Sequence, residues 1–356
     1  MTAQKSKLYH FIKSKYIIWT KWEYMPMLAT NIPVFICYLY YSLRSGSITF
    51  FKWANPGVPM GGAFGISKYD MMKDVSNPWL PKMLLIKKGQ SVDQLINELN
   101  QNEIDYPIII KPDIGERGFF VKKIIDENEL KQYLSSMPCD MIVQKFIDLP
   151  HEYTLSFYSL PENPESFTIT SICKKGFMQI KGDGIHTGRE LMALDRRLYL
   201  QITRFENEHS EWLDKIIEKD QIILPEPVGN HNRGTAFFDA RHLISKPLID
   251  TYRNHCLNLK GIYIGRFDLK ANSEQDFIKG NVNVLELNGV LGEPVHVYDP
   301  NYSPINAYKD LFSQWNTIYR ISKLNRTSNR LSFSFKEAYQ LVKEYFEHKK
   351  SLKSIR

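Results

Sequence analysis

The chain has 356 residues, of which 43% are hydrophobic and 24% charged, a globular composition that excludes disordered and collagen-like chains. Lys and Arg outnumber Asp and Glu by 46 to 39, and the resulting formal charge of +7 suits an anionic partner without identifying one. The four cysteines, Cys37, Cys139, Cys173 and Cys256, are too scattered to predict a zinc site or a disulfide framework, which favours a reducing compartment.

Residues 1–65 form an N-terminal segment rich in aromatic side chains, for which we expect helices and then a short strand at 47–53. Residues 24–43 carry no charge and approach the roughly 20 residues of a membrane span, although prolines interrupt them. Three interpretations stay open: a helix buried on the protein body or in a homodimer, a membrane-surface helix with contact through 17–44, or a true span. Because no secretory signal is visible, we expect a cytoplasmic protein, peripheral at the inner membrane face under the second interpretation.

Residues 66–148 alternate short apolar strands with short helices, which predicts an α+β lobe. Val92, Leu95 and Leu99 follow Ser91 at helical spacing, and serine is a favoured N-cap residue. The predicted helices span 67–73, 91–100 and 127–135, and the predicted strands span 81–87, 107–111, 118–125 and 141–146.

We expect a second lobe over residues 149–325. It begins with a hairpin across a turn that contains Pro and Asn. Its predicted strands span 153–159, 166–174, 235–239, 262–270 and 282–288, with one more near 222, and its predicted helices span 191–219 and 249–259. We expect a C-terminal amphipathic helix within residues 326–356. The predicted fold class is therefore α+β, with two lobes.

The first chemical signal is a lysine at the end of an apolar strand. Lys111 is followed by a turn that contains Gly115 and Gly118, whose backbone N–H groups can approach phosphate oxygens because glycine has no Cβ. The pattern lacks the Gly-Lys-Ser/Thr helix start of a P-loop. It predicts a phosphate cradle, with a plain β-hairpin as the alternative.

The second signal is a pair of strands with charged residues at alternate positions. Strand alternation places Arg266, Asp268 and Lys270 on one face of the first strand. After a polar turn predicted at 272–281, it places Glu286 and Asn288 on one face of the second. Two half-buried carboxylates would repel each other, and a Mg²⁺ ion that takes carboxylate and amide oxygens resolves that conflict. The alternative is a solvated surface hairpin in which Arg266 pairs with Asp268.

The third signal is an apolar strand at residues 142–147 that leads through a polar link into another strand. Such a link suits a hinge between lobes, where an adenine can lie against the backbone. Glu152 can accept hydrogen bonds from ribose hydroxyls there.

These three signals, in this order, resemble the ATP-grasp superfamily over residues 65–300. The likeness is to its carboxylate–amine ligases, such as D-alanine–D-alanine ligase and cyanophycin-synthetase-like enzymes. The stretches KPDIGERG, IVQKFIDLPHEYT and GRFDLK with LELNG resemble its phosphate lid, adenine linker and metal-binding pair. GISK resembles the first nucleotide lysine, and KGDGIHT resembles a run found in peptide-ligase-like members.

The resemblance implies an ATP-grasp fold that binds ATP and Mg²⁺ between two α+β lobes. The phosphate-binding residues that it implies are Lys68, Lys111, Gly115, Glu116, Arg117 and Gly118, and the adenine- and ribose-binding residues are Gln144, Lys145, Phe146, Ile147 and Glu152. It implies Asp268, Glu286 and Asn288 as metal ligands and Arg266 as the catalytic residue that steadies charge on the transferring phosphoryl group.

The activity implied is an ATP-dependent ligase that joins a small-molecule carboxylate to an amine through an acyl phosphate. Its substrate-binding candidates are Lys181, Asn230, His231, Arg233 and Gly289. A small-molecule kinase and a non-catalytic, membrane-associated nucleotide-binding protein are the alternatives. We expect no nucleic-acid partner, because the basic residues are dispersed and no recognition motif occurs. The N-terminal α/β domain typical of these ligases is missing or replaced, so D-alanine specificity does not carry over.

Overall fold

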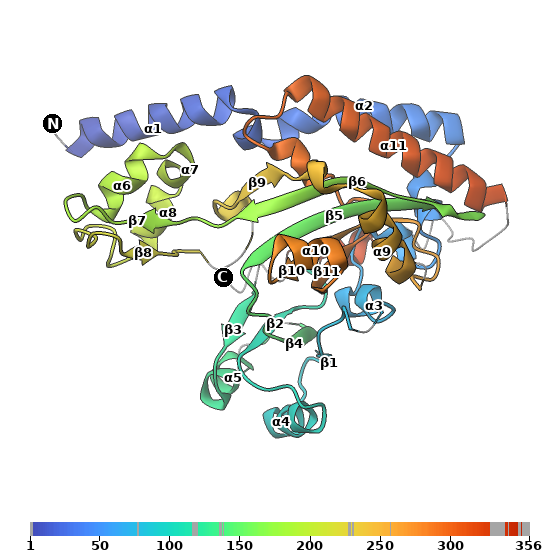
Figure 1. The fold of residues 1–356 in the computed structure, drawn as a ribbon, viewed down its shortest axis with the longest axis horizontal. Helices are drawn as coiled ribbons and strands as arrows, with labels where there is room; N and C mark the ends of the chain where they lie inside the picture. The colour runs from blue at the N-terminus through green and yellow to red at the C-terminus, as the bar shows by residue number, and fades with distance from the viewer. Residues whose placement is uncertain are drawn as a thin grey trace.

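The structure, a computed structural model, describes residues 3–76, 78–115, 120–134, 137, 139–226, 229, 231–256, 258–327, 339–340, 342–347 and 350. Two main antiparallel sheets organise these residues, and the N-terminal helices lie on the far side of the larger sheet from the smaller one (Figure 1). The α+β class expected from the sequence is thus confirmed.

The smaller sheet, with its two helices, is called lobe A here. Its strands run in the order β1-β4-β2-β3, and they are β1 (Met83–Ile86), β2 (Ile108–Pro112), β3 (Lys122–Ile124) and β4 (Met141–Lys145). Its helices are α4 (Val92–Gln101) and α5 (Glu127–Leu134). The side chain of Ser91 caps α4 by accepting a hydrogen bond from the Gln94 N–H, and Leu95 and Leu99 pack into the lobe's core. The predicted amphipathic helix is therefore confirmed.

The larger sheet, with the elements packed on it, is called lobe B here. Its order is β11-β10-β5-β6-β9, and its strands are β5 (His151–Leu160), β6 (Asn163–Gly176), β9 (Ala236–Asp239), β10 (Ile264–Ala271) and β11 (Val282–Asn288). Helices α3 (Lys68–Met72), α9 (Lys246–Cys256) and α10 (Glu274–Lys279) accompany this sheet. Aromatic side chains such as Tyr153, Phe157 and Phe267 fill its core, which leaves the other face of the strands free for polar residues.

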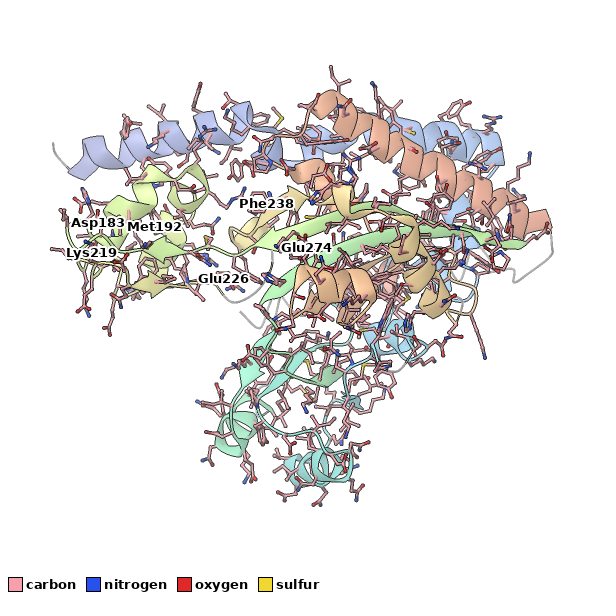
Figure 2. The ribbon with its side chains drawn as sticks, in the orientation of Figure 1. Asp183, Met192, Lys219, Glu226, Phe238 and Glu274 are labelled. Atoms are coloured by element: carbon pink, nitrogen blue, oxygen red, sulfur yellow. The ribbon has the colours of Figure 1, made fainter. Side chains whose placement is uncertain are left out.

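A smaller layer extends from the end of β6. It contains β7 (Ile180–Lys181), β8 (Ile222–Ile223), α6 (Gly188–Leu194), α7 (Arg196–Tyr199) and α8 (Ile202–Asn207). Asp183 and Lys219 lie at its outer end (Figure 2). Helix α1 (Ala3–Thr20) covers this layer, with Ile17 buried among its apolar side chains.

The remaining elements join the N-terminal segment to lobe B. They are α2 (Met27–Ser45), α11 (Pro304–Thr327) and the 3₁₀ turns η1 (Trp22–Tyr24), η2 (Phe50–Ala54), η3 (Pro59–Gly62), η4 (His231–Arg233), η5 (Arg241–Leu243) and η6 (Val295–Tyr298). Helix α2 packs on α11, and the Trp22 Nε1 donates to the Val297 carbonyl at 2.7 Å. Among the described residues, no helix has both the length and the apolar character needed to cross a membrane.

Three predicted elements were wrong in detail. The strand at 47–53 is instead the 3₁₀ turn η2, in which the consecutive Phe50 and Phe51 are both buried, a pattern that strand alternation does not give. The long helix at 191–219 breaks at Asp195, whose side chain caps the new helix α7. The turn between β10 and β11 contains the helix α10.

Two C-terminal features also differ from expectation. Helix α11, with 24 residues the longest in the described part of the chain, was not predicted. The expected helix within 326–356 lies largely outside the described residues.

Candidate functional site

A cavity of about 490 Å³ lies where the two sheets face each other. Most of the predicted site residues line it, namely Lys68, Lys111, Gly115, Gln144, Lys145, Phe146, Ile147, Glu152, His231, Arg266, Asp268, Glu286 and Asn288. Residues up to 220 positions apart in sequence are thus gathered at one place by the two sheets. The three signals of the sequence analysis therefore meet in one cavity.

The other predicted residues fall into two groups. Glu116, Arg117, Gly118 and Asn230 lie outside the described residues. Lys181, Arg233 and Gly289 are described but do not line this cavity.

These three residues have other surroundings. Lys181 is exposed on β7 and pairs with Asp220, and Arg233 donates from Nε to Glu226 at 2.5 Å. Gly289 packs backbone to backbone, since a Cβ there would lie 2.5 Å from the Gly61 carbonyl oxygen. Close packing, rather than an opening toward the cavity, explains why this position is glycine.

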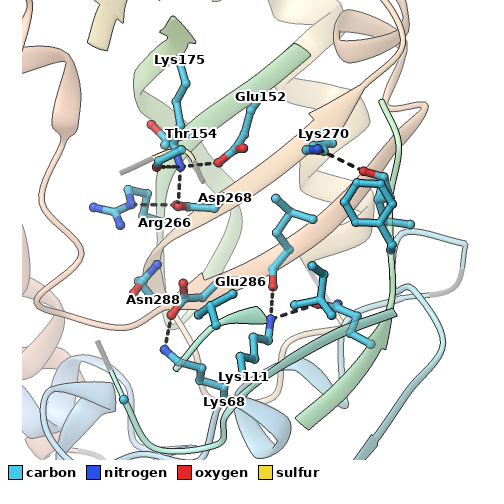
Figure 3. Close-up of a pocket in the computed structure, with 18 of the residues that line it drawn as sticks. Lys68, Lys111, Glu152, Thr154, Lys175, Arg266, Asp268, Lys270, Glu286 and Asn288 are labelled. Atoms are coloured by element: carbon cyan, nitrogen blue, oxygen red, sulfur yellow. Dashed lines mark hydrogen bonds and ion pairs between the residues drawn. The ribbon is translucent and has the colours of Figure 1, made fainter. Parts of the chain in front are cut away.

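The register of the strands places the acidic residues side by side. Asp268 on β10 lies opposite Glu286 on β11, and Arg266 lies opposite Asn288. On the other side of β10, Asp268 lies opposite Thr154 of β5. These side chains share one face of the sheet and project into the cavity (Figure 3). The solvated surface hairpin is therefore excluded, although the Arg266–Asp268 pair that it included does occur, at 3.2 Å.

Asp268 is held in its charged form by two cations. The Lys175 ammonium lies 3.0 Å from Asp268 Oδ2, and the Arg266 Nε lies 3.2 Å from Oδ1. Burial raises the pKa of this carboxyl, but the attraction of Lys175 and Arg266 outweighs burial, so its pKa lies below the usual range. The site therefore holds a buried carboxylate at neutral pH.

Glu286 is paired with the ammonium of Lys68. Burial and the charge of Asp268 raise the pKa of Glu286, but the attraction of Lys68 and Lys111 outweighs them, so its pKa lies below the usual value. The helix that carries Lys68 is itself anchored to lobe A, because Asp113 Oδ1 accepts hydrogen bonds from the Ser67 hydroxyl and the Tyr69 N–H, both at 3.0 Å. Asp113 therefore fixes the start of α3 and the position of Lys68.

Lys111 reaches from lobe A to lobe B. Its ammonium donates to the Gln144 side-chain oxygen and to the Leu285 carbonyl, each at 2.9 Å. Burial lowers the pKa of Lys111 to about 8, with the charge of Lys68 acting in the same direction and that of Glu286 opposing it. Among the described contacts, the Lys111 ammonium has no carboxylate directly bonded to it, so its charge can interact with an anionic ligand in the cavity.

Two lysines of the cavity were missed as site residues by the sequence analysis. Lys175 on β6 is only 8% exposed and donates to Glu152, Asp268 and the Gly229 carbonyl. Lys270 donates to the Ile147 carbonyl at 3.0 Å and lies over the Phe146 ring. Alternation correctly placed Lys270 on the face of Asp268, but no site role was assigned to it. No such signal exists for Lys175, because the sequence does not tell which residue of the Lys174-Lys175 pair points inward.

The acidic and amide side chains of β10 and β11 offer oxygen donors for a divalent cation. Two carboxylates in cross-strand register and the Asn288 amide supply the hard oxygen ligands that Mg²⁺ takes. The Asn288 side-chain nitrogen is buried and has no hydrogen-bond partner among the described residues. No cluster of three or more His, Cys, Asp or Glu side chains suited to a metal occurs among the described residues. The two carboxylates and the amide therefore fit Mg²⁺ only as part of its ligand set, with water or phosphate oxygens as the other ligands.

A second cavity of about 1130 Å³ shares His231 and Phe237 with the first. Its walls come from α1, η1, α7, α8 and the η6 region. The His231 ring lies among the rings of Tyr24, Phe237 and Tyr298, and within the described part of the chain its Nε2 has no hydrogen-bond partner. Burial lowers the pKa of His231 to about 4, so this imidazole is neutral at physiological pH.

Comparison with known proteins gives one family match. Residues 76–155 match the family model of the RimK-like ATP-grasp domain. Among curated proteins, none matches the sequence.

Solved structures with a similar arrangement were also found, at low identity. D-alanine–D-alanine ligase from Bacillus anthracis, complexed with ATP, is 13% identical with a TM-score of 0.43, over 74% of this chain and 68% of that one. VanG D-Ala:D-Ser ligase from Enterococcus faecalis is 14% identical with a TM-score of 0.41, over 74% and 64%. A bifunctional glutathione synthetase from Pasteurella multocida is 14% identical with a TM-score of 0.37, over 69% and 36%.

The family match covers the segment from the end of α3 through lobe A to the start of β5, which includes Lys111, the adenine-linker motif and Glu152. The sequence motifs continue beyond it on β10 and β11. Over residues 76–155 the chain thus resembles a RimK-like ATP-grasp domain.

Proposed function

We propose that this protein is an ATP-dependent ligase that joins a carboxylate to an amine and releases ADP and phosphate. The proposal depends on one observation: two lysines face a set of carboxylate and amide groups in the same cavity. Lys68 and Lys111 lie on one side, and Asp268, Glu286 and Asn288 lie on the other (Figure 3). A triphosphate with a divalent cation has the charge distribution that this arrangement complements.

In this proposal the nucleotide lies between lobe A and lobe B. Helix α3, which falls in the predicted lobe 66–148, packs on β11 of lobe B. Lys68 and Lys111 would bind the phosphates, with Lys68 exchanging Glu286 for phosphate oxygens. The adenine would lie along residues 144–147, which line the cavity, and Glu152 would face the ribose. The predicted lid at residues 115–118 would close over the phosphates, although only Gly115 of it is described.

Asp268, Glu286 and Asn288 would hold Mg²⁺. When bound, the ion neutralises charge on the phosphates and orients the terminal phosphoryl group. Lys175 and Arg266 already neutralise Asp268, and this pairing keeps the carboxylate ionised and its position fixed. Because Lys175 and Arg266 keep Asp268 ionised despite its burial, its carboxylate can still bind a metal ion.

The chemistry requires positioning more than a protein nucleophile. An oxygen of the substrate carboxylate attacks the γ-phosphorus, the bond to the β,γ-bridging oxygen breaks, and acyl phosphate and ADP form. The amine then attacks the acyl carbon, phosphate leaves and the amine loses a proton. Arg266 would stabilise the negative charge on the transferring phosphoryl group and on the tetrahedral intermediate. Its guanidinium is already fixed at the cavity, because its Nη1 donates to the Glu293 carbonyl at 3.1 Å.

We propose that the second cavity receives the condensing substrate. It meets the first cavity at His231 and Phe237, so a ligand in it can reach the terminal phosphate. Its wall includes α1 and η1, elements of the N-terminal segment that precedes lobe A in the sequence. Cations and acids are balanced in its lining, and aromatic rings make up much of the rest. This lining suits a substrate with an apolar body and paired charges rather than a small polyanion.

An acyl phosphate distinguishes a ligase from a small-molecule kinase, since both release ADP. In turnover reactions with candidate carboxylates, hydroxylamine is expected to divert the intermediate into an acyl hydroxamate, measured by mass spectrometry. A matched reaction without ATP should give no hydroxamate. Formation of a stable phosphorylated hydroxyl compound, with no hydroxamate from any active substrate, would assign the kinase activity instead.

If Lys111 binds ATP, ATP affinity should depend on pH, and the direction of that dependence follows from the lowered pKa of Lys111. Its ammonium is present below a pKa of about 8 and is lost above it, so ATP affinity is expected to fall as the pH rises past 8. Lys111→Met should weaken ATP binding at neutral pH by about 10–100-fold, the value of one charged hydrogen bond. It should also remove the wild-type pH dependence near 8. Titration calorimetry at several pH values measures both, and an unchanged profile in the variant would remove Lys111 from the nucleotide site.

A further inference from the structure

Helices α1 and α2 expose an unusual number of large apolar side chains. Six on α1 and eight on α2 are exposed, with fractions that reach 86% at Leu28 and 84% at Leu43. We call this set the outer stripe; it comprises Leu8, Tyr9, Phe11, Ile12, Tyr16 and Trp19, followed by Met27, Leu28, Ile32, Phe35, Ile36, Leu39, Tyr40 and Leu43. These positions recur every three to four residues along each helix, so they form one face of each.

The opposite faces of the same helices are fixed to the protein. Ile17 of α1 and Val34 of α2 are buried, at 4% and 7% exposure. The Tyr308 hydroxyl donates to the Thr30 carbonyl at 3.1 Å, and Glu23, between the two helices, forms a nearly buried ion pair with Arg197. Both helices are therefore packed on the protein through one face, and the outer stripe is the opposite face that this packing leaves exposed.

Both helices lie along one edge of the molecule, on the side away from lobe A (Figure 1). Side chains project outward from this edge along both helices (Figure 2). An exposed apolar surface of this extent is rare on a monomeric soluble protein and indicates a binding surface.

The ionisable groups of this edge have one sign. Neither α1 nor α2 contains an Asp or Glu, whereas Lys15, Lys21 and Arg44 are exposed in or beside them. Trp and Tyr side chains are frequent in the stripe, and these are the residues that settle at the level of lipid headgroups. Apolar, aromatic and cationic groups on one face, without acids, complement an anionic lipid surface.

We propose that α1 and α2 lie in the interface of an anionic membrane, with the outer stripe inserted among the lipids and the flanking cations at the headgroups. Neither helix combines the length and the apolar character needed to span a membrane, so we propose contact with one leaflet. A symmetric homodimer through the same face would bring the cations of one copy against those of the other, which disfavours it. Tyr9 and Phe11 also line the second cavity, so that cavity borders the proposed lipid surface.

The test is sedimentation of the full chain with sucrose-loaded vesicles. Vesicles of phosphatidylcholine with phosphatidylglycerol are expected to bind the protein, and phosphatidylcholine alone to bind it much less. The double variant Leu28→Glu, Leu43→Glu should lower partitioning by about 100-fold, because two apolar anchors are lost and two negative charges are added. Both side chains are more than four-fifths exposed, so the fold should be preserved, as circular dichroism can verify.

The matched control places the same charges elsewhere. Ile125 and Ile185 are 63% and 71% exposed and lie outside α1 and α2, so Ile125→Glu, Ile185→Glu should bind vesicles like the wild type apart from a small charge effect. Three outcomes would overturn the proposal: no binding to anionic vesicles, equal loss in both double variants, or a dimer by light scattering that Leu28→Glu, Leu43→Glu converts to monomer. The last would assign the stripe to a homodimer interface.

Discussion

Glu286→Gln is expected to lower the rate of ADP release by about 10²–10³-fold while the protein stays folded. The substitution keeps the shape of the side chain but removes one of the two negative charges that face the cavity from β10 and β11. Several kcal/mol of transition-state stabilisation depend on a divalent ion at such a site, and this corresponds to the stated loss of rate. The variant should also need a higher Mg²⁺ concentration for half-maximal nucleotide binding. Steady-state ADP release and a Mg²⁺ titration measure the two effects.

A second Glu→Gln variant separates this effect from the loss of any ion pair. Glu165 pairs with Arg253 at 2.5 Å, is 77% exposed and does not line the cavity. Glu165→Gln therefore loses an ion pair without touching the proposed site, and its ADP release should match the wild type. If Glu286→Gln were as active as Glu165→Gln, the metal assignment would be wrong.

Lys175→Met is expected to lower the free energy of unfolding by about 3–5 kcal/mol, the largest effect on stability that we predict from a single side chain. Lys175 is buried between Glu152 and Asp268, at 2.5 and 3.0 Å. Burial alone would lower its pKa, but the two carboxylates outweigh burial and raise it, so the ammonium is retained. Its removal leaves two buried carboxylates with one fewer cation. Urea unfolding followed by circular dichroism measures the change.

The neighbouring lysine provides the control for this prediction. Lys174 points to the other side of β6, where its ammonium lies 5.7 Å from the centre of the Tyr153 ring and outside the cavity. Lys174→Met should cost less than about 1 kcal/mol, as is usual for a partly exposed charge. Equal losses in the two variants would show that Lys175 is not the cation that compensates Glu152 and Asp268.

The strand pair that carries the acids was predictable from sequence for a physical reason. In a hairpin, side-chain direction alternates with period two, so Arg266 and Asp268 had to share a face, and β11 returns beside β10 after a short connection. The place of Lys111 at the cavity was predictable because an apolar strand leads directly into it. Ser91 predicted the start of α4 because a serine side chain satisfies a free N–H group there.

What could not be predicted depends on register and on distant packing. The pairing of β5 with β6 shifts at two places, so the inward direction of Lys175 cannot be counted along the sequence from the turn. The second cavity combines α1, α7, α8 and η4, which are far apart in the chain. Helix α11, by contrast, could have been found, since Ala307, Leu311, Ile318 and Ile321 recur at helical spacing and are all buried.

The most direct test of the proposed nucleotide site is a crystal structure of the full chain with a non-hydrolysable ATP analogue and Mn²⁺, whose position anomalous scattering reveals. We expect a Mn²⁺ peak bounded by Asp268, Glu286 and Asn288 and by phosphate oxygens, with the Lys68 ammonium moved from Glu286 onto the phosphates. An analogue bound outside the cavity between the two sheets, or a Mn²⁺ peak away from those three side chains, would contradict this expectation.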